Sequence, residues 1–457
     1  IKNPFHNLVP PNTHLLAHWD EDKEMARQYF AGTNPVTIRV CDKPREQLSK
    51  EMLHFFAANQ NTADIAKLAA EKRLFYANYE HLFKYKTNPH HAFPKELFGG
   101  KKPPFFDQLE YYFQPCAILL VLDDHQELDI LAISIDDHDH GNDDSDDEKA
   151  MLHHRRVYSK DTCTCSEWRM ARGVVSNADS QIHQWISHLG NCHMGMEPII
   201  IGIHNTLKAT NHPLMDYFTP AIKDTLAINW LALNSLSRYG PMAGGDLISS
   251  MGVGQFMQLI RDDWQQKPFF ERYSLPDELA SRGFDEDFDA PGYLYRTDGL
   301  KLYNAIGDFV TEFVNEIYET DAQVANDAGL QDWAMETSAP DRGAIPGFPT
   351  KFEDKATLIK TMQTIWWIAS GLHSAINTSQ FDYLSFGPSR PLHLRKTMKM
   401  CKEEAPMHND DDDEDWFFRE ACPNQTLNKI NIISSRILTL PSETTIDKLS
   451  CHYKKAR

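Results

Sequence analysis

The sequence lacks an excess of basic residues. Its 46 lysines and arginines are outnumbered by 65 aspartates and glutamates, which gives a formal net charge of −19 at pH 7. A chain with this charge repels the phosphate backbone of nucleic acids, so we expect no nucleic-acid partner. The same charge disfavours an anionic membrane, which leaves open only a transient, local contact with a membrane surface.

Long apolar runs and a zinc-binding pattern of cysteines are also missing. No stretch reaches the roughly 18 apolar residues that a membrane-spanning helix needs, and the first residues do not resemble a secretory leader. The 8 cysteines include one Cys163-Thr-Cys165 pair, which lacks zinc-finger spacing and a second pair. Free thiols in a reducing compartment are therefore expected, and with them a cytoplasmic location.

The apolar and turn-forming residues predict a mainly helical fold with a small β element. At 457 residues and 41% apolar content, the chain can form one large domain or two to three ordinary ones. Asp22–Phe30 and Arg45–Ala58 have helical periodicity. Two short apolar runs, Cys116–Leu122 and Ile130–Ile135, flank the polar residues 123–127 and predict a β-hairpin.

Further along the chain, Asp216–Leu236 and Lys301–Tyr318 are predicted as helices, the second with an apolar stripe that faces the core. Two acidic tracts, 136–148 and 409–415, are predicted as solvated loops. A calcium loop starting at Asp137 would place its fifth position on Gly141, which has no side-chain oxygen.

Three histidines recur every five residues at His183, His188 and His193, in an apolar stretch. On an ordinary α-helix, residues five apart lie roughly 140° away from each other around the axis. A π-type turn brings such residues nearly into register, and these turns occur mainly at functional sites. The spacing therefore indicates a metal site, for which imidazole suits Zn, Cu, Fe and Ni. The alternative is chance, because the chain has 21 histidines and a histidine on an apolar helix is often a core residue.

A second helix is predicted at Thr357–Gln380, with apolar residues at steps of three and four. His373 and Asn377 are four residues apart, so they share one face, and Gln380 follows one turn later. This pair could supply further metal ligands. Alternatively, His373 packs in the core and Asn377 ends the helix.

These segments resemble the lipoxygenase family. The matching words are WRMARGVVSNADSQIHQWISHLGNCHMGMEP (Trp168–Pro198), HPLMDYFTPAIKDTLAINWLALNSL (His212–Leu236), IASGLHSAINTSQFDY (Ile368–Tyr383) and HWDEDKEMARQYFAGTNPVTIR (His18–Arg39). The resemblance covers nearly the whole chain and is closer to animal-type members. It implies that residues 1–457 form a single, mainly helical catalytic domain that is incomplete at both ends.

The resemblance also implies a role for each matching residue. It implies one non-haem iron per chain, bound by His188, His193, His373 and, as a weaker ligand, Asn377. His183 matches a neighbouring histidine that is not a ligand. Gln184 and Gln380 match amides that link the ligands to the substrate channel, and the positions implied along that channel are Ser180, Ala232 and Leu236.

The implied reaction is dioxygenation of a polyunsaturated fatty acid, with the fatty acid and O₂ as partners. A hydrogen atom would leave a bis-allylic carbon, O₂ would add to the resulting radical, and a hydroperoxide would form. No side chain is implied as a catalytic group beyond the iron-bound hydroxide. The protein would hold the iron and shape a dry channel.

Three departures from the family pattern stand out. Thr378 and Ser379 occupy positions where Phe and Gly are common in the family. Family members end in an Ile or Val whose carboxylate binds iron, whereas this chain ends DKLSCHYKKAR. The family's N-terminal β-sandwich also has no counterpart. Either the sequence is partial or the protein holds iron with four side chains, which would weaken iron binding and activity.

Two other function classes remain open on the sequence. One is a relative that isomerises fatty-acid hydroperoxides at the same iron, and the other is a catalytically inactive lipid-binding relative. A zinc hydrolase is disfavoured, because no Glu stands beside the histidine pair at the spacing that such a base requires.

Overall fold

Helices dominate the computed structural model, which describes residues 12–59, 64–85, 111–137, 155–235, 249–288, 290–405, 416–423 and 425–439. Five short strands in these ranges form one antiparallel sheet. The expected fold class, mainly helical with a small sheet, is confirmed.

The sheet has strands in the order in which they occur along the chain. They are β1 (Arg39–Val40), β2 (Leu74–Asn78), β3 (Cys116–Leu122), β4 (Leu128–Asp136) and β5 (Arg155–Tyr158), and each pairs antiparallel with the next. The predicted hairpin is confirmed as β3 and β4. Its turn includes Gln126 with φ of 64°. The sequence did not predict the other three strands.

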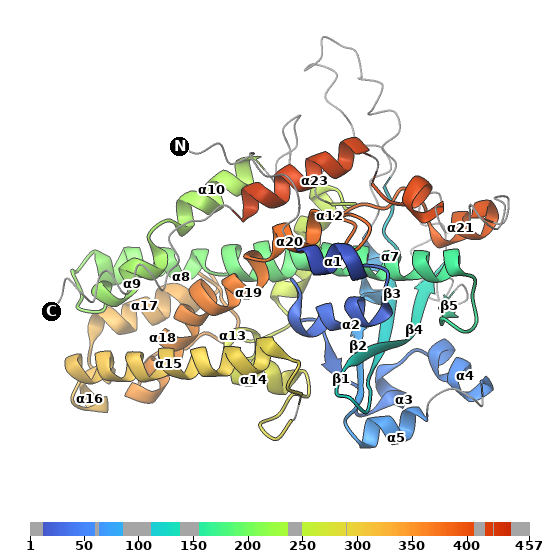
Figure 1. Ribbon diagram of the computed structural model, residues 1–457. Helices are drawn as coiled ribbons and strands as arrows, with labels where there is room; N and C mark the ends of the chain where they lie inside the picture. The colour runs from blue at the N-terminus through green and yellow to red at the C-terminus, as the bar shows by residue number, and fades with distance from the viewer. Residues whose placement is uncertain are drawn as a thin grey trace, which may run out of the picture.

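Side chains on the two faces of the sheet belong to different clusters, as the alternation along a strand requires. Leu119 and Ala132 join a small cluster with Met52 and Phe56. Their neighbours Ile118, Leu120 and Ile133 belong to the main core. Figure 1 shows α4 and α5 near one side of the sheet and α7 crossing the other.

The N-terminal part contains short helices. They are α1 (Thr13–His18), α2 (Asp22–Ala31), α3 (Pro44–Gln47), α4 (Lys50–Ala58), α5 (Ile65–Ala70) and the 3₁₀-helix η1 (Glu80–Lys84). The helix predicted at Asp22–Phe30 is confirmed. The single helix predicted at Arg45–Ala58 is wrong, because the chain breaks at Leu48 and Ser49. The Ser49 hydroxyl accepts a hydrogen bond from the Met52 N–H at 3.3 Å and begins a new helix there.

A long helical rod crosses the molecule (Figure 1). It consists of α7 (Cys165–Ile182), the π-helix η4 (His183–Met194), α8 (Glu197–Ile203) and the π-helix η5 (His204–Lys208). Thr164 and Glu167 form a capping box at its start, which satisfies two of the N–H groups left free there. The expected π-type turn is confirmed, and it spans the whole histidine segment.

The remaining helices surround this rod. They are α9 (Met215–Ile222), α10 (Thr225–Ser235), α12 (Val253–Trp264), α13 (Phe269–Tyr273), α14 (Leu275–Ser281), α15 (Leu294–Ile317), α16 (Asp321–Ala325), α17 (Ala328–Ser338), α18 (Lys355–Trp367), the π-helix η6 (Ile368–Leu372), α19 (His373–Asn377), α20 (Gln380–Leu384), α21 (Met398–Glu404), the π-helix η8 (Phe417–Ala421) and α23 (Gln425–Leu438).

Two predicted helices differ from the structure. The helix at Asp216–Leu236 is divided by Lys223 and Asp224 into α9 and α10, and Leu236 lies outside the described residues. The helix at Thr357–Gln380 contains the unpredicted π-helix η6 and ends at Asn377.

Two residues of η6 make close contacts with the turn before them. The Ser370 hydroxyl donates to the Trp366 carbonyl at 2.6 Å, so a side chain competes for a backbone acceptor. A Cβ on Gly371 would lie 2.1 Å from the Trp367 ring, so only glycine fits there. By contrast, the stripe predicted on α15 does face the core, where Ile306 and Val310 are buried.

The acidic tracts fall mostly outside the described residues, which exclude 138–148 and all of 409–415. Asp136 ends β4 rather than beginning a loop, and Asp137 forms an ion pair with Lys402 at 2.7 Å. None of the helices in the described ranges has the length and apolar content to cross a membrane. The cysteines in these ranges are all free thiols.

Candidate functional site

Three histidine side chains from two separate helical segments converge at one point. The Nε2 atom of His193 lies 3.2 Å from Nε2 of His188 and 3.2 Å from Nε2 of His373. Their potential ligand atoms all lie within 4.8 Å of one another. The structure therefore brings together the three histidines that the resemblance implied as metal ligands.

The π-helices explain this convergence. In η4 the five-residue spacing places His188 and His193 on the same side, with ring centroids 4.8 Å apart. His373 begins α19, directly after the π-helix η6, and its ring centroid lies 5.0 Å from that of His193. His188 and His193 thus lie within a π-helix, and His373 directly follows one.

Burial keeps these imidazoles neutral. It lowers the pKa of His373 to about 3 and lowers the pKa values of His188 and His193, because a charged ring loses its hydration there. The neighbouring rings add to this effect for His188 and His373. At neutral pH each ring therefore retains a lone pair, which a metal ligand requires.

The donor set fits a transition metal. Among the residues that the structure describes, the cluster contains three imidazoles and no carboxylate or thiolate. Calcium and magnesium prefer oxygen ligands, whereas imidazole suits iron, zinc, copper and nickel. The residues present therefore fit non-haem iron, although three imidazoles alone do not choose among these metals.

Asn229 fixes the orientation of His193 and was not identified from the sequence. Its Nδ2 donates to the His193 carbonyl at 3.0 Å and to Glu197 Oε2 at 3.2 Å, so its Oδ1 is the acceptor. His193 Nδ1 must then donate to that oxygen, 3.0 Å away, which leaves the Nε2 lone pair facing the cluster. The sequence contains no signal for this role. Only the fold shows that Asn229 is buried on the largely exposed α10.

Replacing Asn229 by leucine is expected to weaken iron binding by about 10- to 100-fold, the usual effect of losing a group that orients a ligand. Affinity for Fe²⁺ can be measured by competition with a chelator. Asn229→Asp, which keeps an acceptor for His193, should bind more tightly than Asn229→Leu. The matched control is Asn234→Leu on the same helix, since Asn234 is exposed and donates to the Trp230 carbonyl. Unchanged affinity in Asn229→Leu would remove Asn229 from this role.

The two predicted glutamines contact each other and the histidine cluster. Gln184 Nε2 donates to Gln380 Oε1 at 2.8 Å. Gln380 Nε2 donates to Asn377 Oδ1 at 2.7 Å and lies 3.3 Å from His188 Nδ1. Asn377 therefore lies next to the cluster, with its side-chain oxygen accepting from Gln380. Its role as a metal ligand stays a prediction.

His183 stands apart from the cluster. It is fully buried, and its Nε2 donates to the Ile376 carbonyl at 2.9 Å, so it ties η4 to α19. Its ring centroid lies 6.4 Å from that of His188. Burial lowers the pKa of His183 to about 4, so the ring is neutral at pH 7.

The predicted channel positions have different surroundings. Ser180 is fully buried, and its hydroxyl donates to the Ser176 carbonyl in its own helix at 2.8 Å. Ala232 is half-buried on α10, and Leu236 lies outside the described residues. Thr378 and Ser379, where the sequence departs from the family pattern, line a groove of about 410 Å³ that also touches α2 and α15.

A buried polar network reaches η4 through Ser187. Asp179 and Arg390 form an ion pair with side chains 1% and 4% exposed. Asp179 Oδ1 also accepts from Tyr79 at 2.6 Å and from Asn34 at 2.7 Å. Asn34 in turn accepts from the Ser187 hydroxyl at 2.8 Å, so the network reaches the residue before His188.

Comparison with known proteins places these features in a family. The family model described as lipoxygenase matches residues 108–449. The chain is 28% identical over 451 residues to linoleate 9S-lipoxygenase 1 of Oryza sativa subsp. japonica, which covers 95% of this chain and 50% of that protein. It is also 28% identical over 475 residues to linoleate 9S-lipoxygenase 1 of Hordeum vulgare, covering 99% of this chain and 51% of that protein. The chain thus spans about half the length of these curated relatives.

Solved structures share the fold. A calcium-dependent 11R-lipoxygenase superposes with a TM-score of 0.75 at 22% identity and covers 98% of this chain and 62% of that chain. A coral 8R-lipoxygenase superposes with a TM-score of 0.73 at 21% identity, covering 98% of this chain and 63% of that chain.

Proposed function

Because this chain belongs to the lipoxygenase family, we propose that it is a non-haem iron dioxygenase that inserts O₂ into polyunsaturated fatty acids to give hydroperoxides. The observation that carries the proposal is the convergence of three neutral imidazoles, from η4 and α19, at one point. Iron is one of the transition metals that imidazole ligands suit.

In this proposal His188, His193 and His373 would hold the iron, with Asn377 as a weaker ligand. Bound iron would supply the one-electron chemistry that removes a hydrogen atom from a bis-allylic carbon. The chain's own contribution is to orient the imidazoles, through Asn229 for His193 and through the Gln380 amide beside His188.

The finer predictions are part of the same proposal. Ser180, Ala232 and Leu236 are proposed to border the acyl chain of the fatty acid. Residues 1–457 are proposed to belong to one catalytic domain. Assignment to the animal-type members rests on the matching sequence segments alone, because the curated relatives above are plant proteins. The proposed cytoplasmic location rests on the expectation that the cysteines are free thiols in a reducing compartment.

The test combines metal analysis with oxygen uptake. Protein supplied with Fe²⁺ is expected to retain one iron per chain and to consume O₂ on addition of linoleate or arachidonate, with growth of conjugated-diene absorbance. Loss of a fatty-acid hydroperoxide without O₂ uptake would instead indicate an isomerase. Failure to retain iron would indicate an inactive lipid-binding relative, and either result would overturn the proposal. The same protein kept free of iron is the control.

A further inference from the structure

The groove that Thr378 and Ser379 line has a largely apolar wall and a volume of about 410 Å³. This volume falls within the roughly 300–1,000 Å³ that is typical of ligand pockets. The wall is built by three parts of the chain, which are the end of α2, the first half of α15 and the segment from α18 to α19. Its apolar residues include Phe30, Leu294, Tyr295, Leu302, Trp367 and Ala375.

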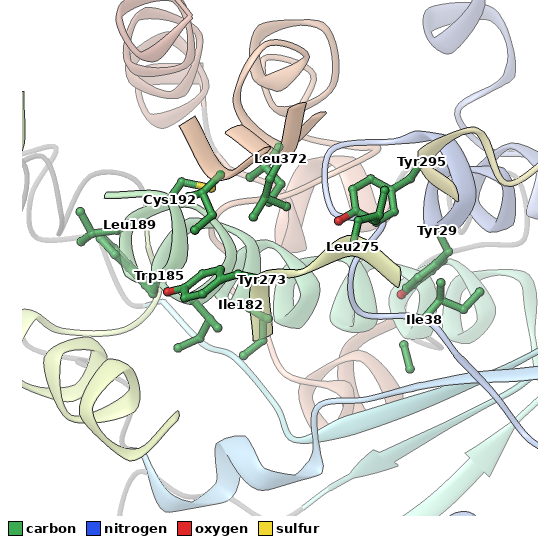
Figure 2. Close-up of a cluster of buried hydrophobic side chains, with 14 of the residues drawn as sticks. Tyr29, Ile38, Ile182, Trp185, Leu189, Cys192, Tyr273, Leu275, Tyr295 and Leu372 are labelled. Atoms are coloured by element: carbon green, nitrogen blue, oxygen red, sulfur yellow. The ribbon is translucent and has the colours of Figure 1, made fainter. Parts of the chain in front are cut away.

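Two aromatic side chains of this wall are held by the core. A Cβ on Gly299 would lie 3.2 Å from the Trp367 ring, and one on Gly371 would lie 2.1 Å from it, so the ring fills the space beside both glycines. The Tyr295 ring centroid lies 6.1 Å from that of Trp367, and Figure 2 shows Tyr295 within a cluster of buried hydrophobic side chains. Such rings bury apolar ligand surface and also attract cations.

The charged residues that line the groove are both acidic. They are Asp298 and Asp382, and no lysine, arginine or histidine of the described part of the chain lines it. Asp298 is exposed and forms an ion pair with Lys301 at 3.0 Å. Asp382 is half-buried, and its carboxylate forms no hydrogen bond or ion pair with any residue that the structure describes. The groove therefore combines an apolar wall with a carboxylate that has no partner.

The carboxylate of Asp382 is costly to keep charged in this position. Burial raises its pKa, because the ionised group loses hydration, and the charge of Arg436 in α23 acts in the opposite direction. The Arg436 guanidinium lies over the Phe381 ring instead, 5.2 Å from its centroid. A cation placed beside Asp382 would offset this cost through a charge-assisted hydrogen bond. The net charge of −19 would favour the approach of such a cation.

We propose that this groove binds an organic ammonium ion, with the ammonium group at Asp382 and an apolar body against Leu294, Tyr295 and Trp367. A bare metal cation would leave the apolar wall in contact with water, and an organic anion would meet two carboxylates. The apolar wall and the charge of the lining thus both favour the same class of ligand.

This site is distinct from the histidine cluster. None of the three clustered histidines lines the groove. His373 belongs to the cluster, whereas its neighbours Ser374 and Ala375 on α19 line the groove. Binding of an ammonium ion there requires neither iron nor a fatty acid, so this proposal and the proposed dioxygenase function can fail independently.

Matched probes test the proposal by titration calorimetry of the full chain. Phenylethylammonium carries both the charge and an apolar ring, and it is expected to bind. Phenylethanol lacks the charge and ethylammonium lacks the ring, so each should bind at least about tenfold more weakly. The anion phenylpropanoate should not compete with phenylethylammonium. Absence of phenylethylammonium binding, or equal binding of any of the other three probes, would overturn the proposal.

Variants of Asp382 locate the ammonium group. Asp382→Asn is expected to weaken phenylethylammonium binding by about tenfold, whereas Asp382→Glu should retain most of it. The matched control is Asp308→Asn, since Asp308 is exposed on α15 and does not line the groove. Circular dichroism verifies that each variant is folded. Unchanged binding in Asp382→Asn would show that the ammonium group lies elsewhere and would overturn the proposal.

A second variant tests the apolar wall at a position where folding is not at risk. Leu294 is 50% exposed, and Leu294→Ser should weaken phenylethylammonium binding by about threefold, because it removes apolar surface that the ligand would cover. Full affinity in this variant would also count against the site.

One further variant excludes binding at the histidine cluster, since an amine can bind a metal ion. His373→Ala should leave the affinity for phenylethylammonium unchanged, because His373 does not line the groove. Loss of binding in His373→Ala with retention in Asp382→Asn would place the amine at the histidine cluster and overturn the proposed site in the groove.

Discussion

Replacing Arg390 by methionine is expected to lower the free energy of unfolding by about 3–5 kcal/mol, the usual cost of removing one partner of a buried ion pair. The variant would leave the Asp179 carboxylate, 1% exposed, without its cation. The hydrogen bonds from Tyr79 and Asn34 would remain, but neither donor carries a charge. The effect should reach η4, because Asn34 also accepts from Ser187.

Urea unfolding at neutral pH measures this loss. The control is Arg342→Met, which removes a partly exposed ion pair with Glu336 and should cost no more than about 1 kcal/mol. Adding Asp179→Leu to Arg390→Met should restore part of the stability, because no buried charge is then left unpaired. A loss in Arg390→Met as small as that in the control would show that the pair does not hold this part of the core together.

Replacing His373 by alanine is expected to weaken iron binding strongly. If a total binding free energy of roughly 10–16 kcal/mol is shared among four ligands, each contributes about 3 kcal/mol, which corresponds to a weakening on the order of 100-fold. His373 is also the histidine that joins the second helical segment to the cluster, so its loss leaves both remaining imidazoles on η4.

Iron content after dialysis against a chelator measures the effect, with circular dichroism to confirm folding. The matched control is His204→Ala, because His204 also lies in a π-helix, η5, but outside the cluster. The control should retain iron and oxygen uptake. If His373→Ala retained as much iron as His204→Ala, the three histidines would not form one metal site.

Local patterns predicted the elements that carry the site. The five-residue spacing of His183, His188 and His193 indicated a π-type turn, which depends only on residues within one segment. The turn at η6 was missed, because apolar periodicity at steps of three and four predicts a continuous α-helix there.

The sequence by itself determined which groups each segment can offer. These are imidazoles at five-residue spacing, two apolar runs that form a hairpin, and segments that match a family. Only the tertiary structure decided which groups meet. Asn229 is 36 residues from His193 and reaches it because α10 lies against η4. Such pairings depend on how helices pack across long stretches of chain, and no spacing along the sequence records that.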